Sequence, residues 1–85
     1  MLSYGDEKRL AYIILNELSR VKNGKRKNHL YDLVNSELND VEKTDEIFKP
    51  LLKLLETDGY IINNDDKYSF RSPLLKDYWY NQFGK

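Results

Sequence analysis

The sequence has no cysteine, a single histidine and only four glycines. Without cysteine there is no disulfide, zinc–thiolate site or iron–sulfur cluster, and thiol catalysis is excluded. With His29 as the one histidine, a histidine-rich metal site is excluded as well. The glycines, at positions 5, 24, 59 and 84, are isolated, so no G-x-x-x-x-G-K loop followed by Ser or Thr is present to hold a triphosphate. These absences predict a chain without a cofactor or metal.

The sequence also lacks an excess of charge of either sign and a long apolar run. Fourteen basic residues balance fourteen acidic ones, which argues against a protein that coats nucleic acid in general. The apolar stretch near the start, Ala11 to Leu15, is far shorter than a signal peptide's apolar region or the roughly 20 residues of a membrane span. We therefore expect a cytoplasmic location and no membrane partner. The 85 residues predict one domain, residues 1–85, with a modest core.

Apolar residues that recur every three or four positions predict two helices in the first half of the chain. The first is expected from about Asp6 to about Lys22, with Gly24 as its stop. The second is expected to be capped by Asn28 and to end before Asn39. The polar, basic residues between these helices are interpreted as a connector.

A third helix is predicted from about Glu42 to Thr57, with Leu54 and Leu55 anchoring its end in the core. It is expected to be the most buried helix. Pro50 removes one helical hydrogen bond, so the helix either kinks there or ends near Phe48 and starts again at Pro50.

The rest of the chain predicts a β-hairpin and a C-terminal helix. Two β-prone runs, 60–62 and 68–70, flank the turn-forming residues 63–66. Ser72 followed by Pro73 is typical of a helix start. In that last helix we expect Trp79 and Phe83 to lie in the core, and Tyr80 to remain exposed.

The order helix–helix–helix–hairpin–helix is typical of a winged helix-turn-helix domain, mainly α with a small β-hairpin. In this interpretation the hairpin is the wing. The third helix then takes the place of the recognition helix of a DNA-binding protein.

The segment YSFRSPLLKDYWYNQF, residues 68–83, resembles the closing part of the archaeal-type P-loop ATPases (AAA/STAND-like ATP-binding proteins), in which a winged-helix domain follows the ATPase core. The resemblance lies in the aromatic strand end at Phe70, then Ser72, the Pro73–Leu75 run, Lys76 and the aromatic residues 78–80. It covers about residues 10–83 and is specific from Leu51 onward. It implies that the chain is the C-terminal accessory module of a longer ATPase. Since the ATPase machinery is absent, no nucleotide-binding role is carried over to any residue.

Charge is distributed unevenly along the sequence. Residues 31–66 carry three cations and ten anions, a net charge of −7, whereas residues 1–30 carry +4 and residues 67–85 carry +3. An acidic third helix would be repelled by DNA phosphates. We therefore expect a non-catalytic module that docks onto a basic protein surface, such as its own ATPase core, through the third helix and the wing. The candidate docking residues are Asp45, Glu46, Lys49, Lys53 and Tyr80.

The alternative is a winged-helix transcription regulator that contacts DNA phosphates. Its candidate contacts are Arg20, Lys22, Lys25, Arg26 and Lys27, supported by Lys8, Arg9 and the C-terminal cations on one face. The same cations also fit a solvated connector, and a structural spacer is a third interpretation. An enzyme is not expected, because His29 has no recognisable nucleophile near it and the carboxylate pairs 45–46 and 65–66 are adjacent rather than facing each other.

Overall fold

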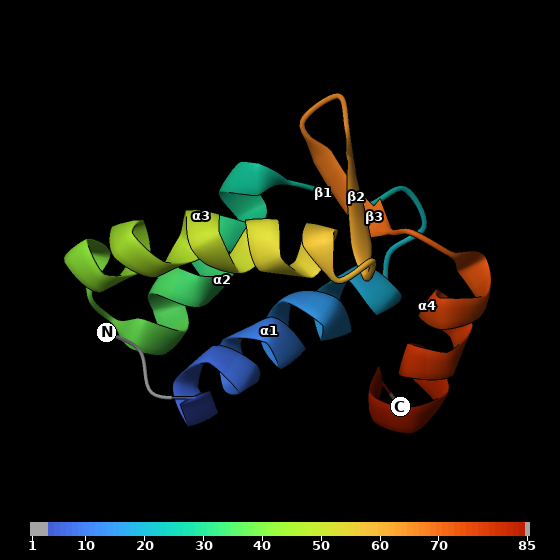
Figure 1. The fold of residues 1–85 in the computed structure, drawn as a ribbon, viewed down its shortest axis with the longest axis horizontal. Coiled ribbons are helices and arrows are strands. Elements are labelled where there is room, and N and C mark those ends of the chain that lie inside the picture. The colour runs from blue at the N-terminus through green and yellow to red at the C-terminus, as the bar shows by residue number, and fades with distance from the viewer. Residues whose placement is uncertain (1–3, 85) are drawn as a thin grey trace.

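The computed structural model describes residues 4–84 and consists mainly of helices with a small antiparallel sheet, as predicted. Figure 1 shows α1, α2 and α3 packed together, the β2–β3 hairpin projecting beyond them, and α4 returning beside α1. No helix in residues 4–84 is long and apolar enough to cross a membrane. The elements in chain order are α1 (Tyr4–Ser19), β1 (Lys25–Arg26), α2 (Lys27–Leu38), α3 (Val41–Thr57), β2 (Ile61–Asn64), β3 (Lys67–Phe70), α4 (Pro73–Trp79) and the π-helical turn η1 (Tyr80–Gly84).

The sheet has three antiparallel strands in the order β1-β3-β2. The predicted hairpin is confirmed, with Ile61 opposite Phe70. Its turn is formed by Asp65 and Asp66, whose φ angles of 53° and 66° both lie in the left-handed region, as a two-residue type I′ turn requires. The connector prediction for residues 25–26 is wrong, because these residues form β1 and pair with β3.

Gly24 places β1 against the sheet. It was predicted to stop α1, but α1 ends at Ser19, whose hydroxyl donates a hydrogen bond of 2.8 Å to the carbonyl of Asn16. Gly24 has a φ of 76°, and a Cβ atom there would lie 2.4 Å from the carbonyl oxygen of Tyr68. Only glycine permits this approach of the chain to β3.

The starts of α2 and α3 differ in their capping. The cap of α2 is Arg26 rather than the predicted Asn28, and it makes no side-chain capping bond. Between the two helices Asn39 adopts the left-handed conformation, and the Asp40 carboxylate then accepts a hydrogen bond of 3.2 Å from the backbone N–H of Lys43. Two residues are therefore sufficient to turn the chain and start α3.

Pro50 lies inside α3, which is a single helix from Val41 to Thr57. Of the two alternatives left open by the sequence, division of the helix near Phe48 is therefore excluded. Pro50 is exposed, so water can replace the hydrogen bond that the ring removes from the helix.

The core lies between the three large helices, the sheet and α4. On α3 the buried stripe begins with a polar residue, Thr44, whose hydroxyl donates to the carbonyl of Asp40 at 2.8 Å. The stripe is thereby shifted from the predicted one, and Leu54 is 41% exposed rather than an anchor. The buried hydrophobic residues are Leu10, Ile14, Leu15, Leu18, Leu30, Val34, Phe48, Leu51, Leu52, Leu55, Ile61, Tyr68, Phe70 and Trp79.

The C-terminal helix attaches to α1 through Trp79. The predicted start is confirmed, since the Ser72 hydroxyl accepts from the N–H of Leu75 and Pro73 is the first helical residue. The indole N–H of Trp79 donates to Asn16 Oδ1 at 2.6 Å. Phe83 contacts Trp79 with ring centroids 4.6 Å apart and the ring planes tilted by 44°, but it is 43% exposed, so the prediction that it lies in the core is wrong.

Candidate functional site

The first candidate surface is acidic and lies where α2 and α3 meet. Asp45 and Glu46 are both exposed on the first half of α3, as predicted. The hydroxyl of Tyr31, on α2, donates a hydrogen bond of 2.5 Å to Asp45 Oδ1. This bond raises the pKa of Tyr31 above 10, with further contributions from burial and from the charges of Asp45 and Asp32.

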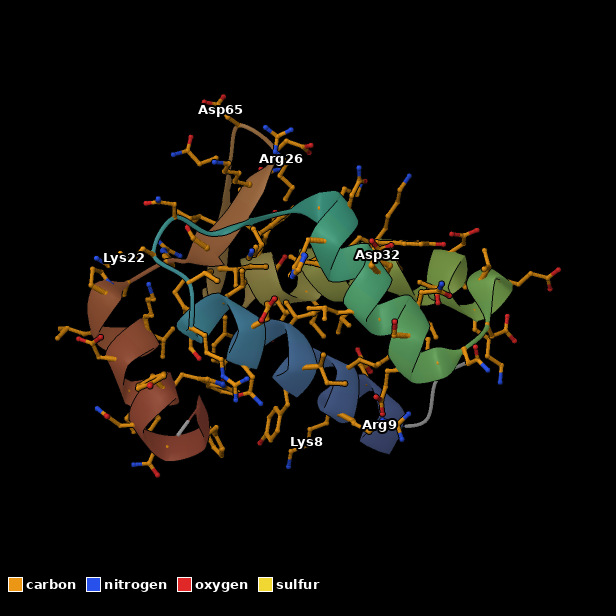
Figure 2. The ribbon with its side chains drawn as sticks, turned by 180° about the vertical axis from the view of Figure 1, so that it is seen from behind. Lys8, Arg9, Lys22, Arg26, Asp32 and Asp65 are labelled. Atoms are coloured by element: carbon orange, nitrogen blue, oxygen red, sulfur yellow. The ribbon has the colours of Figure 1, made fainter. Side chains whose placement is uncertain are left out.

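The influence of Asp32 on Tyr31 indicates that carboxylates of two helices gather around this phenol. Figure 2 shows Asp32 on α2 with its side chain turned to the solvent. Glu42 lies one helical turn before Glu46 on α3 and is also exposed. We call the group of Asp32, Glu42, Asp45 and Glu46 the acidic surface. It can attract a cationic partner without a change in conformation.

Lys49 and Lys53 follow Asp45 on the same face of α3, one and two helical turns further along the helix. Together with Lys27, the first residue of α2, they line a hollow of about 140 Å³. The hollow is completed by Glu56 and Tyr68. We call it the lysine hollow. The sequence placed Lys27 with the phosphate-binding candidates and the other two lysines with the docking candidates, whereas the fold brings the three together.

The basic residues after α1 are divided among several elements. Arg20 and Lys22 lie in the loop after α1, and both are exposed. Lys25 and Arg26 form β1, where Arg26 is directly opposite Lys67 of β3. The five candidates therefore extend from a loop, along the sheet edge, to the start of α2.

Lys8 and Arg9 are not on the same face as these residues. Figure 2 shows both at the lower edge of the domain, below α1, with Arg26 at the opposite edge beside the hairpin. Lys8 Nζ lies 5.7 Å from the centre of the Tyr12 ring, and Arg9 Nε lies 3.4 Å from Glu37 Oε1. The single basic face that the DNA-binding alternative requires is thus not assembled.

The C-terminal helix α4 and the turn η1 after it form a third exposed region. Tyr80 is 40% exposed, as expected, and two other residues of this segment are more exposed, namely Tyr78 at 58% and Leu74 at 81%. Figure 1 shows α4 at the end of the domain opposite the start of α3. Tyr80 is therefore not part of the acidic surface.

An apolar groove of about 360 Å³ runs between α1 and the end of α3. Leu15 and Leu51 line it with the indole of Trp79, and Glu7 and Asp58 lie at its charged margin. This groove was not predicted from the sequence. The exposed Leu54 beside it is the one signal that could have indicated it, and the helical periodicity had assigned that residue to the core.

His29 lies on α2 beside α1. Its Nε2 contacts Glu17 Oε2 and links α2 to α1. Within residues 4–84, no three His, Asp or Glu side chains are grouped in a way that could hold a metal ion. Comparison with protein-family models, with curated proteins and with solved structures finds no significant match to this chain.

Proposed function

We propose that this chain is a winged-helix module without catalytic activity, which docks onto the core of an archaeal-type P-loop ATPase through its acidic surface. The fold part of the proposal is supported by the element order α1-β1-α2-α3-β2-β3 and the strand order β1-β3-β2, in which β2 and β3 serve as the wing. The family part is supported by the resemblance of residues 68–83. The proposal keeps the cytoplasmic location expected from the sequence.

The observation that carries the docking proposal is the acidic surface itself. Exposed carboxylates on two adjacent helices produce a concentrated negative potential, which steers a basic partner surface into contact. The same carboxylates oppose DNA, because α3 would bring Glu42, Asp45 and Glu46 towards phosphates if it entered the major groove. A basic protein surface therefore suits α3 better than a duplex does.

The test uses the ATPase core of the native product and the 85-residue chain. The double variant D45N/E46Q removes two charges, and the amide that replaces the Asp45 carboxylate keeps an oxygen that accepts the Tyr31 hydrogen bond. Two exposed ion pairs contribute up to about 2 kcal/mol together, so we expect the dissociation constant, measured by calorimetry, to rise between about twofold and thirtyfold. The control E7Q/D77N removes the same charge elsewhere. Equal affinity of all three proteins, or no association of the wild type at low salt, contradicts docking through this surface.

A further inference from the structure

The lysine hollow lies where the N-terminal end of α2 meets the second half of α3. Lys27, the first residue of α2, lines it together with Lys49 and Lys53, which lie one helical turn apart on α3. The other charged group of the lining is the carboxylate of Glu56. Three ammonium groups and one carboxylate give the lining a net charge of +2.

The three ammonium groups have no partner within the described part of the chain. Among residues 4–84, Lys27, Lys49 and Lys53 form no ion pair and no side-chain hydrogen bond. Asp45 and Glu46 precede Lys49 by one turn on the same face of α3, but neither forms an ion pair with it. The lysines are therefore available to an anion.

The side chain of Tyr68, on β3, also lines the hollow. Only 6% of Tyr68 is exposed, and its hydroxyl forms no hydrogen bond with a described residue. No fully enclosed side-chain nitrogen or oxygen of the described residues lacks a partner, so this oxygen opens onto the hollow rather than into the core. Burial raises the pKa of Tyr68, as do the charges of Glu56 and Asp66, so at neutral pH the phenol keeps its proton. The hollow thus contains a free hydrogen-bond donor on a buried side chain.

The N-terminal end of α2 adds to the positive potential of the hollow. Its cap, Arg26, makes no side-chain capping bond, and the first turn of α2 contains no acidic residue. The first N–H groups of a helix carry a partial positive charge that favours anions. Because Lys27 belongs to this turn, the helix end and the ammonium groups act on the same hollow.

The size and charge of the hollow select one kind of anion. Its volume of about 140 Å³ is well below the roughly 300 Å³ of sites that enclose a drug-sized ligand, so one small group enters it rather than a whole nucleotide. A phosphate monoester has three acceptor oxygens and a charge of about −1.5 to −2 at neutral pH, which matches the lining. A polymer of phosphates fits less well, because its next phosphates would meet Asp45 and Glu46 along α3.

We propose that the lysine hollow binds the terminal phosphate group of a phosphate monoester, with the ammonium groups of Lys27, Lys49 and Lys53 around its oxygens. The hydroxyl of Tyr68 donates a further hydrogen bond to it. A phosphorylated small molecule and a phosphoserine side chain share this chemistry. Binding requires no ATPase core, so the proposal does not rest on docking through the acidic surface.

Nuclear magnetic resonance titration of the isotope-labelled 85-residue chain with inorganic phosphate tests the proposal. The backbone signals of Lys27, Lys49 and Tyr68 should shift and saturate. The variant K49Q/K53Q loses two charge-assisted hydrogen bonds, so we expect its dissociation constant to rise at least about tenfold. Y68F loses one neutral donor, which should raise the constant about twofold to tenfold. E56Q should lower it about twofold to fivefold, because the carboxylate that opposes the anion is removed.

A matched control and a peptide complete the experiment. The control K8Q/K43Q removes two lysines that do not line the hollow, and it should bind phosphate like the wild type. Circular dichroism checks that each variant is folded. Tighter binding of a phosphoserine peptide than of inorganic phosphate assigns the hollow to a phosphorylated protein segment, whereas equal binding assigns it to a phosphorylated small molecule.

Four results overturn the proposal. They are the absence of saturable shifts at low salt, an equal loss of affinity in K49Q/K53Q and K8Q/K43Q, weaker binding by E56Q, and equal binding of the peptide without its phosphate. Association with the ATPase core is measured separately, on D45N/E46Q. The two proposals therefore fail independently.

Discussion

The hydroxyl of Tyr31 donates a hydrogen bond of 2.5 Å to Oδ1 of Asp45 and joins α2 to the acidic half of α3. The hydrogen bond fixes the position of one carboxylate oxygen of Asp45. The neighbouring Glu46 is exposed and forms no hydrogen bond of this kind with another described residue. The phenol therefore reports on the acidic surface, since its ionisation responds to the carboxylates around it.

This pair predicts a loss of stability at alkaline pH. Since the pKa of Tyr31 is raised in the folded protein, the folded state holds the phenolic proton more strongly than the unfolded state. The stabilisation is complete below the ordinary value of about 10 and is lost as the pH rises through the raised pKa. Ultraviolet titration should show the Tyr31 signal, identified by its loss in Y31F, move to lower pH in D45N. It should not move in D77N, and an unchanged titration in D45N would show that Asp45 does not control the phenol.

Gly24 is predicted to be intolerant of substitution. Its left-handed backbone alone makes G24A unfavourable by about 1–3 kcal/mol, and the new Cβ would also press on the carbonyl of Tyr68. G59A is the matched control, because Gly59 has a similar φ of 86° but its nearest atom, Arg71 Nη1, is 3.6 Å from the added Cβ. Urea unfolding should show a clearly larger loss for G24A. Equal losses would mean that the approach of Gly24 to β3 contributes nothing.

The bond between Asn16 and Trp79 is predicted to hold α4 on α1. In N16A the nearly buried indole N–H loses its acceptor, which costs about 1–3 kcal/mol. The variant N16D retains an acceptor and should lose less. Trp79 is the sole tryptophan, so its fluorescence follows the unfolding of this part of the chain directly. If N16A and N16D unfold at the same urea concentration as the wild type, the hydrogen bond is not needed to attach α4.

The amphipathic elements could be predicted from the sequence, because their burial follows a local period. This applies to the buried faces of α1 and α2. The hairpin and the start of α4 could also be predicted, because turn-forming residues and the pair Ser72–Pro73 are local signals. β1 could not be predicted, since Lys25 and Arg26 carry no apolar alternation and become a strand only because β3 offers an unpaired edge. The exposure of Leu54 was missed because Thr44 begins the buried stripe, and a polar residue gives no apolar signal.

The candidate surfaces were harder to predict than the elements that carry them. The exposure of Asp45 and Glu46 could be predicted, because they lie on the polar side of one predicted helix, whereas the approach of Asp32 from α2 could not. The lysine hollow could not be predicted either, since Lys27 joins Lys49 and Lys53 only through the packing of α2 on α3 and the pairing of β1 with β3. Net charge along the sequence cannot show such a convergence.

The intact mass of the endogenous product, measured by mass spectrometry from its native cells, tests most directly whether this chain is a module of an ATPase. The account predicts a product larger than 10.2 kDa by at least a nucleotide-binding domain, with these 85 residues at its C-terminal end. A product of 10.2 kDa would contradict the account and identify a protein that functions alone.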